Sequence, residues 1–262
     1  MARLGRWGPP VFVVLLLLLV WEVAVRIVDA DPILLPGPLR VVASLWSFRD
    51  QAVRHLVPTL LETVVGLAVS IAFGIGVAIV LDRVAVLRRA IEPLLVASQT
   101  IPIVAVAPLL VLWFGFGLAP KIVVVVLVTF FPVAVSLLDG FRSAAPEATD
   151  LLRSYAARES QTFRLLRWPV AMPSLFTGLR VAVVYGVIGA VFGEYVGATE
   201  GLGIWMQLSQ NSFRTDLVFA AVLLSAFVSL ALYALVSVAE RALVPWSPRV
   251  RGATTPAPGS GS

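Results

Sequence analysis

The chain has 262 residues, of which 59% are hydrophobic and only 13% are charged, and its mean hydropathy is +0.96. Such values exclude a protein whose surface faces water, so lipid is the solvent for most of the chain. A sequence without cysteine has no disulfide, thiol nucleophile or Cys-ligated metal, and the net charge of +5 comes from basic residues confined to particular loops, which indicates membrane orientation rather than nucleic-acid binding.

The N-terminal part predicts one span and one interfacial helix. Residues 11–28 form the first apolar run, in which Glu22 and Arg26 lie four residues apart and can neutralise each other on one helical face. A cleaved signal peptide is the alternative, but no small-residue cleavage site follows the run, so a retained span is favoured. Residues 36–54 have the spacing of an amphipathic helix at the interface, which connects spans without crossing.

Five further apolar runs are long enough to cross a bilayer, at residues 59–81, 91–114, 122–138, 177–195 and 217–235. We therefore expect an all-α, polytopic membrane protein with six transmembrane helices. With the N-terminus inside, thirteen basic residues lie in cytoplasmic segments, five lie outside and two lie within spans. This asymmetry predicts that both termini are cytoplasmic and that the chain is a multi-pass protein of the cell inner membrane.

Three parts follow from this organisation. Residues 1–58 hold the N-terminal span and the interfacial helix, and residues 59–240 form the membrane domain, with a long cytoplasmic loop at 139–176. Residues 241–262 are expected to be a disordered cytoplasmic tail of low complexity. The glycines of the second and fifth spans, among them Gly66, Gly74, Gly76, Gly186 and Gly189, are expected to allow close helix packing.

Polar residues inside the spans are the candidates for a translocation pathway. Ser98, Gln99 and Thr100 lie between Pro93 and Pro102, where proline frees backbone carbonyls within the bilayer. They either line the pathway or make polar contacts in a kinked helix, and the residues leave both readings open.

Acidic residues near the outer ends of spans carry a second signal. Glu194 is an acid that lipid would penalise, so we expect it to face the pathway or a partner such as Arg180 or another subunit. Fourteen residues separate Glu194 from Arg180, which excludes a direct pair within one helix. Glu62 is expected to snorkel to the interface. The single histidine, His55, is interpreted as interfacial rather than as a catalyst or ligand.

The cytoplasmic loop at 139–176 alternates charged and apolar residues at helical spacing, which predicts a segment that docks on a partner. Its two helical halves should separate near residues 156–160, and Pro169 and Pro173 should end the second half. An amphipathic loop lying on the membrane surface is the alternative.

Residues 150–169, D-L-L-R-S-Y-A-A-R-E-S-Q-T-F-R-L-L-R-W-P, resemble the EAA loop of binding-protein-dependent ABC transport permeases. Asp150 takes the family's acidic position, Leu151 and Leu152 its two alanines, Ala156 its glycine and Pro169 its proline, so four of these positions depart from the commonest residue or residue type. The flanking stretches V-A-S-Q-T-I-P, P-L-L-V-L-W-F-G-F-G, L-L-D-G-F-R-S and G-E-Y-V-G-A also resemble the family.

The similarity extends over residues 59 to about 240 and is nearest to the nitrate, taurine and sulfonate group, within it to permeases for riboflavin or hydroxymethylpyrimidine, a thiamine precursor. It implies a type I permease fold, a second copy of the permease as a homodimer, ABC ATPase subunits in the cytoplasm and an extracytoplasmic binding protein that delivers a small organic solute. It also implies a contact with the ATPase, which we expect at Asp150, Tyr155, Ala156, Ala157, Arg158, Gln161, Phe163 and Pro169.

The chain itself is not expected to be an enzyme or to bind a cofactor. It lacks the G-x-x-x-x-G-K-[ST] phosphate cradle and its only lysine is Lys121, so ATP is expected to act through the partner ATPase. An intramembrane enzyme would need a dyad or a metal cluster that the sequence does not display. An ATPase-independent secondary carrier or channel remains open on composition alone. The candidate pathway residues are Ser98, Gln99, Thr100 and Glu194.

Overall fold

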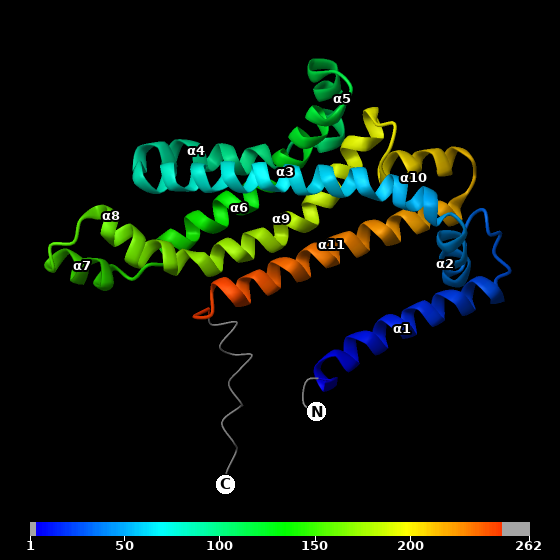
Figure 1. Cartoon of the computed structure of the whole chain (residues 1–262), viewed down its shortest axis with the longest axis horizontal. Coiled ribbons are helices and arrows are strands. Elements are labelled where there is room, and N and C mark those ends of the chain that lie inside the picture. Colours follow the sequence, from blue (N-terminus) through cyan, green and yellow to red (C-terminus); the bar gives the residue numbers. More distant parts are fainter. Residues whose placement is uncertain (1–3, 248–262) are drawn as a thin grey trace, which may run out of the picture.

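The structure is a computed structural model that describes residues 4–247, and its described elements are helices (Figure 1). In chain order they are α1 (Leu4–Ile27), α2 (Pro38–Ser47), α3 (Arg49–Arg83), α4 (Ala85–Ser98), α5 (Ile103–Phe114), α6 (Leu118–Arg142), α7 (Pro146–Ser154), α8 (Glu159–Thr162), the π-helical turn η1 (Phe163–Arg167), α9 (Trp168–Gly197), α10 (Leu202–Asn211) and α11 (Thr215–Leu243). The all-α prediction is confirmed.

Four helical runs among the described residues are long and apolar enough to cross a membrane: α3, α6, the run α8–η1–α9 and α11. The run from Glu159 to Gly197 has 39 residues. At 1.5 Å per residue it is roughly 58 Å long, about twice the hydrocarbon thickness of a bilayer. Its first part therefore extends beyond the lipid and carries the loop at 139–176 on a rigid stem.

The expected third span is broken rather than kinked. α4 ends at Ser98, α5 begins at Ile103, and the two axes bend by 99°. Pro102 stands at the N-cap of α5, where its missing N–H costs no helical hydrogen bond. By length and composition the pair can count as one broken span or as a re-entrant loop, which would make a fifth membrane element among the described residues.

The core forms where α6 and α9 pack along each other with α3 beside both. Glycines make this approach close: a Cβ at Gly66 of α3 would lie 2.5 Å from a methyl carbon of Val125, and one at Gly189 of α9 would lie 2.7 Å from Val128. Gly186 meets Leu67 in the same way, whereas Gly76 faces open space. The glycines therefore do pack helices, with Gly76 as the exception.

The N-terminal helix stands apart from this core (Figure 1), and it meets the rest of the chain through α2 and through Trp21, whose ring centroid lies 5.4 Å from that of Phe219 on α11. Glu22 pairs with Arg26 at 2.7 Å, as the spacing predicts, and its other oxygen accepts the Leu39 N–H at 3.2 Å. The apolar side chains from Val11 to Val20 are exposed on the isolated chain, as befits a helix surrounded by lipid or by another subunit.

The two ends of the bundle differ. Figure 1 shows α7 and α8 together at one end, and α2 and α10 at the other. After α11 the chain turns back at the α7 end, with Val244 buried and the Trp246 indole N–H donating to the Pro169 carbonyl at 3.0 Å. Residues 241–247 are thus attached to the bundle, and the rest of the expected tail, 248–262, lies outside the described residues.

Candidate coupling surface and pathway residues

The loop at 139–176 folds as two short helices separated by a turn. α7 ends at Ser154 and α8 begins at Glu159, so the break falls where the spacing predicts it. The backbone N–H of Arg158 donates to the Gln161 side chain at 2.7 Å, which caps the start of α8. Pro169 and Pro173, however, do not end a helix, because η1 and α9 continue directly from α8.

The π-helical turn explains how the helix passes Pro169. Trp168 donates its N–H to the Phe163 carbonyl five residues earlier, so the hydrogen-bond register widens just before the proline. Because α9 continues directly from η1, Pro169 removes a single donor from an otherwise continuous helix. The expectation that Pro169 and Pro173 separate loop from span was wrong, since the helix passes through both prolines.

Ala156 adopts a left-handed backbone with φ of +55°. An L-residue with a Cβ is strained there, whereas glycine is not. Ala156 is the residue that aligns with the glycine of the EAA pattern, and its backbone has a conformation that glycine adopts without strain.

The tip of the loop is open to solvent. Tyr155 is 78% exposed, and the side chains of Asp150, Arg158 and Gln161 are exposed beside it. Asp150 makes only a 3.4 Å contact with Arg153 on the same helix. Ala157 is half-buried. An exposed tyrosine ring flanked by a cation and a carboxamide is the composition that protein interfaces favour.

Phe163 points the other way, into the permease itself. Its ring centroid lies 5.3 Å from that of Phe141 on α6 and 6.1 Å from that of Trp168, and the Arg83 guanidinium lies 5.7 Å from the ring. These contacts join the loop to α3, α6 and α9 at once. Phe163 therefore anchors the tip to the bundle, in contrast with the exposed Tyr155.

Two ion pairs reinforce this attachment, and the sequence reading did not identify them. Arg167 in η1 donates to Asp82 at the end of α3 at 2.8 Å, with the Asp82 side chain only 3% exposed. Arg142 at the end of α6 makes a two-pronged contact with Glu92 on α4 at 2.7 and 3.0 Å. Acidic residues near the ends of spans were the available signal, because lipid and burial both disfavour an unpaired carboxylate.

Ser98, Gln99 and Thr100 lie at the break between α4 and α5. The Ser98 hydroxyl donates to the Leu95 carbonyl and the Thr100 hydroxyl to the Ala97 carbonyl, each at 2.7 Å, while Gln99 and Thr100 are exposed. Polar side chains here terminate a helix inside the membrane domain and satisfy its last carbonyls.

Glu194 is fully buried within the subunit, at 0% exposure. Its carboxylate accepts the Thr59 hydroxyl at 2.5 Å and the Gly203 N–H at 2.6 Å, and Thr59 in turn accepts the Leu202 N–H at 2.8 Å. The first N–H groups of α10 are thus capped by groups from α3 and α9. Arg180 is not the partner of Glu194, because it pairs with Glu240 on α11.

Gly201 makes the close approach of α10 to Glu194 feasible. Its φ is +136°, and a Cβ at this position would overlap the Glu194 carboxylate. The neighbouring His55 accepts the Gly201 N–H through Nδ1 at 3.1 Å and stacks on Trp205 with centroids 5.8 Å apart. His55 therefore fixes α10 against α3.

Glu62 is buried at 2% exposure and pairs with Lys121 on α6 at 2.6 Å. The expectation that Glu62 reaches out to the interface was wrong: burial against α6 supplies a cation that makes snorkelling unnecessary. Lys121 lies in the first turn of α6, and the sequence gave no indication that Glu62 is its partner.

Comparison with known proteins shows which family the chain belongs to. The family described as "Binding-protein-dependent transport system inner membrane component" matches residues 70–247. The formylaminopyrimidine transport permease protein ThiX of Halalkalibacterium halodurans is 38% identical over 238 residues, covering 90% of this chain and 95% of ThiX. The riboflavin transport system permease protein RibX of Chloroflexus aurantiacus is 34% identical over 241 residues, covering 91% and 90%.

A more distant relative is the taurine transport system permease protein TauC of Escherichia coli, 30% identical over 242 residues. Among solved structures, the inward-facing MetNI methionine ABC transporter has a chain that aligns with a TM-score of 0.61 at 19% identity, covering 73% of this chain and 97% of that one. At this identity the likeness concerns the fold. The chain thus belongs to the binding-protein-dependent transport system inner membrane component family, as an ABC importer permease of the type I group.

Proposed function

We propose that two copies of this chain form one translocation pathway in the cell inner membrane, with ABC ATPase subunits on the cytoplasmic side and a binding protein outside. The observation that carries the proposal is the loop at 139–176, whose exposed tip around Tyr155 is joined through Phe163 and Arg167 to three spans. Such a loop transmits a push from a partner to the bundle. Both termini and the loop are then cytoplasmic, as the distribution of basic residues predicts.

The mechanism follows from differential stabilisation of two conformations. ATP binding brings the ATPase pair together, and the loop tips that rest on the ATPases move with them. Because Phe163 contacts Phe141 and Trp168, and Arg167 holds Asp82, displacement of the tip moves the cytoplasmic ends of α3, α6 and α9 as a unit. Hydrolysis then resets the inward-open state, and the chain itself supplies no phosphate chemistry.

The solute is proposed to be a small organic molecule, first a pyrimidine or flavin vitamin precursor and second a sulfonate or nitrate-type anion. The support is the similarity to ThiX and RibX, with TauC more distant. The binding protein is expected to set most of the specificity. Titration of the binding protein encoded beside this chain with formylaminopyrimidine, riboflavin, taurine, amino acids and sugars tests the solute class. Tight binding of an amino acid or a sugar would refute this solute class and leave the permease role intact.

A secondary carrier or channel is the alternative function, and it predicts transport without any ATPase. Proteoliposomes that contain the permease with and without its ATPase separate the two. The proposal predicts solute accumulation only when ATPase, binding protein and internal ATP are all present. Uptake of the same rate and extent by the permease alone would support the carrier and contradict the proposal.

A further inference from the structure

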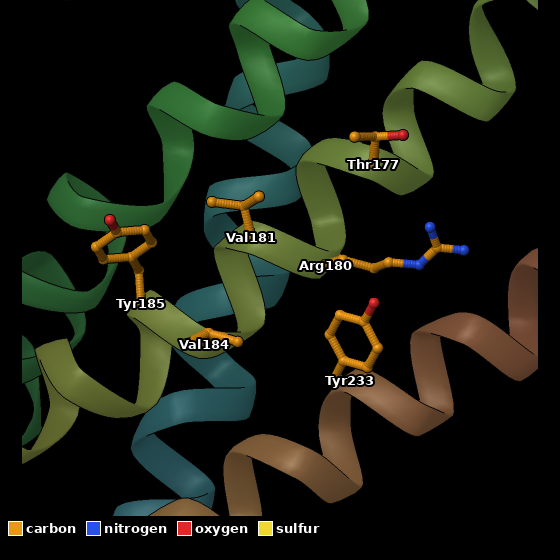
Figure 2. A pocket seen from close by; sticks show the side chains of 6 residues that line it. All are labelled: Thr177, Arg180, Val181, Val184, Tyr185 and Tyr233. Carbon is orange, nitrogen blue, oxygen red and sulfur yellow. The ribbon is translucent and has the colours of Figure 1, made fainter. Parts of the chain in front are cut away.

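A groove opens on the bundle between the spans α9 and α11, apart from the loop and from the Glu194 cluster. Figure 2 shows the side chains that line it, five from α9 and one from α11. Its volume is about 390 Å³, and its lining is Thr177, Arg180, Val181, Val184, Tyr185 and Tyr233. A groove of this size suits a small organic molecule.

The polar end of the groove lies near the start of the span. Arg180 stands three residues after Thr177, where the expected fifth span begins, and its partner Glu240 lies in the last turn of α11, beyond the apolar run at 217–235. The groove therefore opens at the end of the bundle that carries the loop.

Arg180 is held in place by its neighbours on α11. It forms an ion pair with Glu240, whose side chain is 1% exposed, and its guanidinium lies 6.0 Å from the ring centroid of Tyr233. One oxygen of Glu240 has no hydrogen-bond partner within the described residues. Figure 2 shows Tyr233 directed toward Arg180, with Tyr185 at the other end of the groove and Val181 and Val184 between them.

The groove continues into a stripe of exposed side chains on α9 that leads toward the outer end. Val181, Tyr185, Ile188 and Phe192 recur at helical spacing on this face, each at least one-third exposed. A partly polar groove that continues into an apolar stripe toward the outer end gives an imported solute a path of arrival and a place to bind.

We infer that this groove contacts the transported solute during passage, and that the solute is a planar heteroaromatic molecule with ring-nitrogen or carbonyl acceptors. This inference rests on the proposed function. Arg180 offers planar guanidinium donors to such acceptors, and the faces of Tyr185 and Tyr233 offer stacking surfaces. Val181 and Val184 form an apolar part of the lining that makes no hydrogen bonds with a solute. The solute is therefore held weakly there and can be released.

The test uses the whole complex of permease, ATPase and binding protein in proteoliposomes with ATP inside. Labelled formylaminopyrimidine, riboflavin and taurine are supplied as separate probes, and both solute uptake and ATP hydrolysis are measured. The variant Val184→Trp fills the groove, and Val238→Trp on an exposed site of α11 outside the groove is the matched control. We expect Val184→Trp to lower the amount of solute imported per ATP hydrolysed by about tenfold or more, equivalent to roughly 1.4 kcal/mol, and Val238→Trp to leave it unchanged.

A second variant isolates the charges. Arg180→Gln combined with Glu240→Gln removes both members of the pair and leaves no buried charge unpaired, so folding is spared. We expect the KM for uptake of a heteroaromatic probe to rise about tenfold, because its ring acceptors lose the guanidinium donors.

The outcomes separate the two proposals. If uptake by the unmodified complex does not depend on ATP, the proposed function is wrong, and this inference is wrong with it. Wild-type uptake that does depend on ATP, together with wild-type transport by both groove variants, overturns the inference alone. Loss of permease dimerisation in Val184→Trp, measured by size-exclusion chromatography, also overturns it and identifies the groove as an interface between copies.

Discussion

Arg167 and Asp82 are 85 residues apart in the chain and lie 2.8 Å apart in the structure, where they join the stem of the loop at 139–176 to the end of α3. The carboxylate is almost fully buried and the guanidinium is partly exposed. Because of this difference in exposure, removing one partner is expected to cost more stability than removing the other. Removal of the cation strands a buried charge, whereas removal of the anion leaves a cation that water can reach.

The first prediction follows from that asymmetry. Arg167→Gln should lower the free energy of unfolding by about 2–3 kcal/mol, and Asp82→Asn by about 1 kcal/mol or less. Thermal unfolding of the detergent-solubilised permease measures both. The double variant should be less destabilised than Arg167→Gln alone, because no charge is then left buried. Equal effects of the two single variants would mean that the pair is solvated in the protein.

The second prediction concerns the turn between α7 and α8. Ala156→Gly should relieve the left-handed backbone at φ +55° and stabilise the turn by up to about 1 kcal/mol. Ala156→Val should destabilise it, since a β-branched residue tolerates this conformation poorly. The rate of amide hydrogen exchange across residues 146–162 measures the local stability, and it should fall in Ala156→Gly and rise in Ala156→Val. Faster exchange in Ala156→Gly than in the parent chain would contradict the backbone assignment.

The third prediction separates anchoring from docking in the loop. Phe163→Ala removes the contacts with Phe141 and Trp168, so the ATPase should still bind the exposed tip while transport per ATP falls. Leu165→Ala is the matched control, because Leu165 is two residues away and exposed. Co-purification of the ATPase and uptake in proteoliposomes are the two measurements. If Phe163→Ala loses ATPase binding instead, the side chain belongs to the docking surface.

The fourth prediction addresses the buried cluster of Thr59 and Glu194 at the start of α10. Thr59→Val keeps the shape of the side chain but removes the donor to Glu194 and the acceptor for Leu202, which should cost about 1–3 kcal/mol of stability. The control is Thr63→Val, since the Thr63 hydroxyl donates only to the carbonyl one turn earlier in its own helix at 2.7 Å. Equal melting temperatures for the two variants would show that the cluster adds nothing to stability.

Much of the fold could be predicted because lipid imposes long apolar runs with charges between them. The helical class, the loop at 139–176 and its internal break follow from periodicity and composition. The bend angle at Pro102 could not be predicted from the sequence. A proline near polar residues permits a slight kink as readily as the 99° bend that forms between α4 and α5.

The candidate site was harder to predict, since spacing shows what a residue is next to in the chain but not which helix it meets. Tyr155 and Phe163 read alike in sequence, yet one is exposed and the other packs against Phe141. The partners of Glu62 and Glu194 come from other helices and depend on how α3, α6 and α9 approach through glycine contacts. No local pattern encodes those distances.

The coupling role of the loop is tested most directly by the double variant Tyr155→Asp with Arg158→Glu. A carboxylate buried without a partner in the ATPase groove should cost several kcal/mol, on the order of 3–5, while the membrane core is untouched because both residues are exposed at the tip. Co-purification of the ATPase and solute-stimulated ATP hydrolysis are measured on a permease that still inserts and dimerises. The account predicts that both are lost. Retention of both at wild-type levels would contradict it and make the segment a loop on the membrane surface.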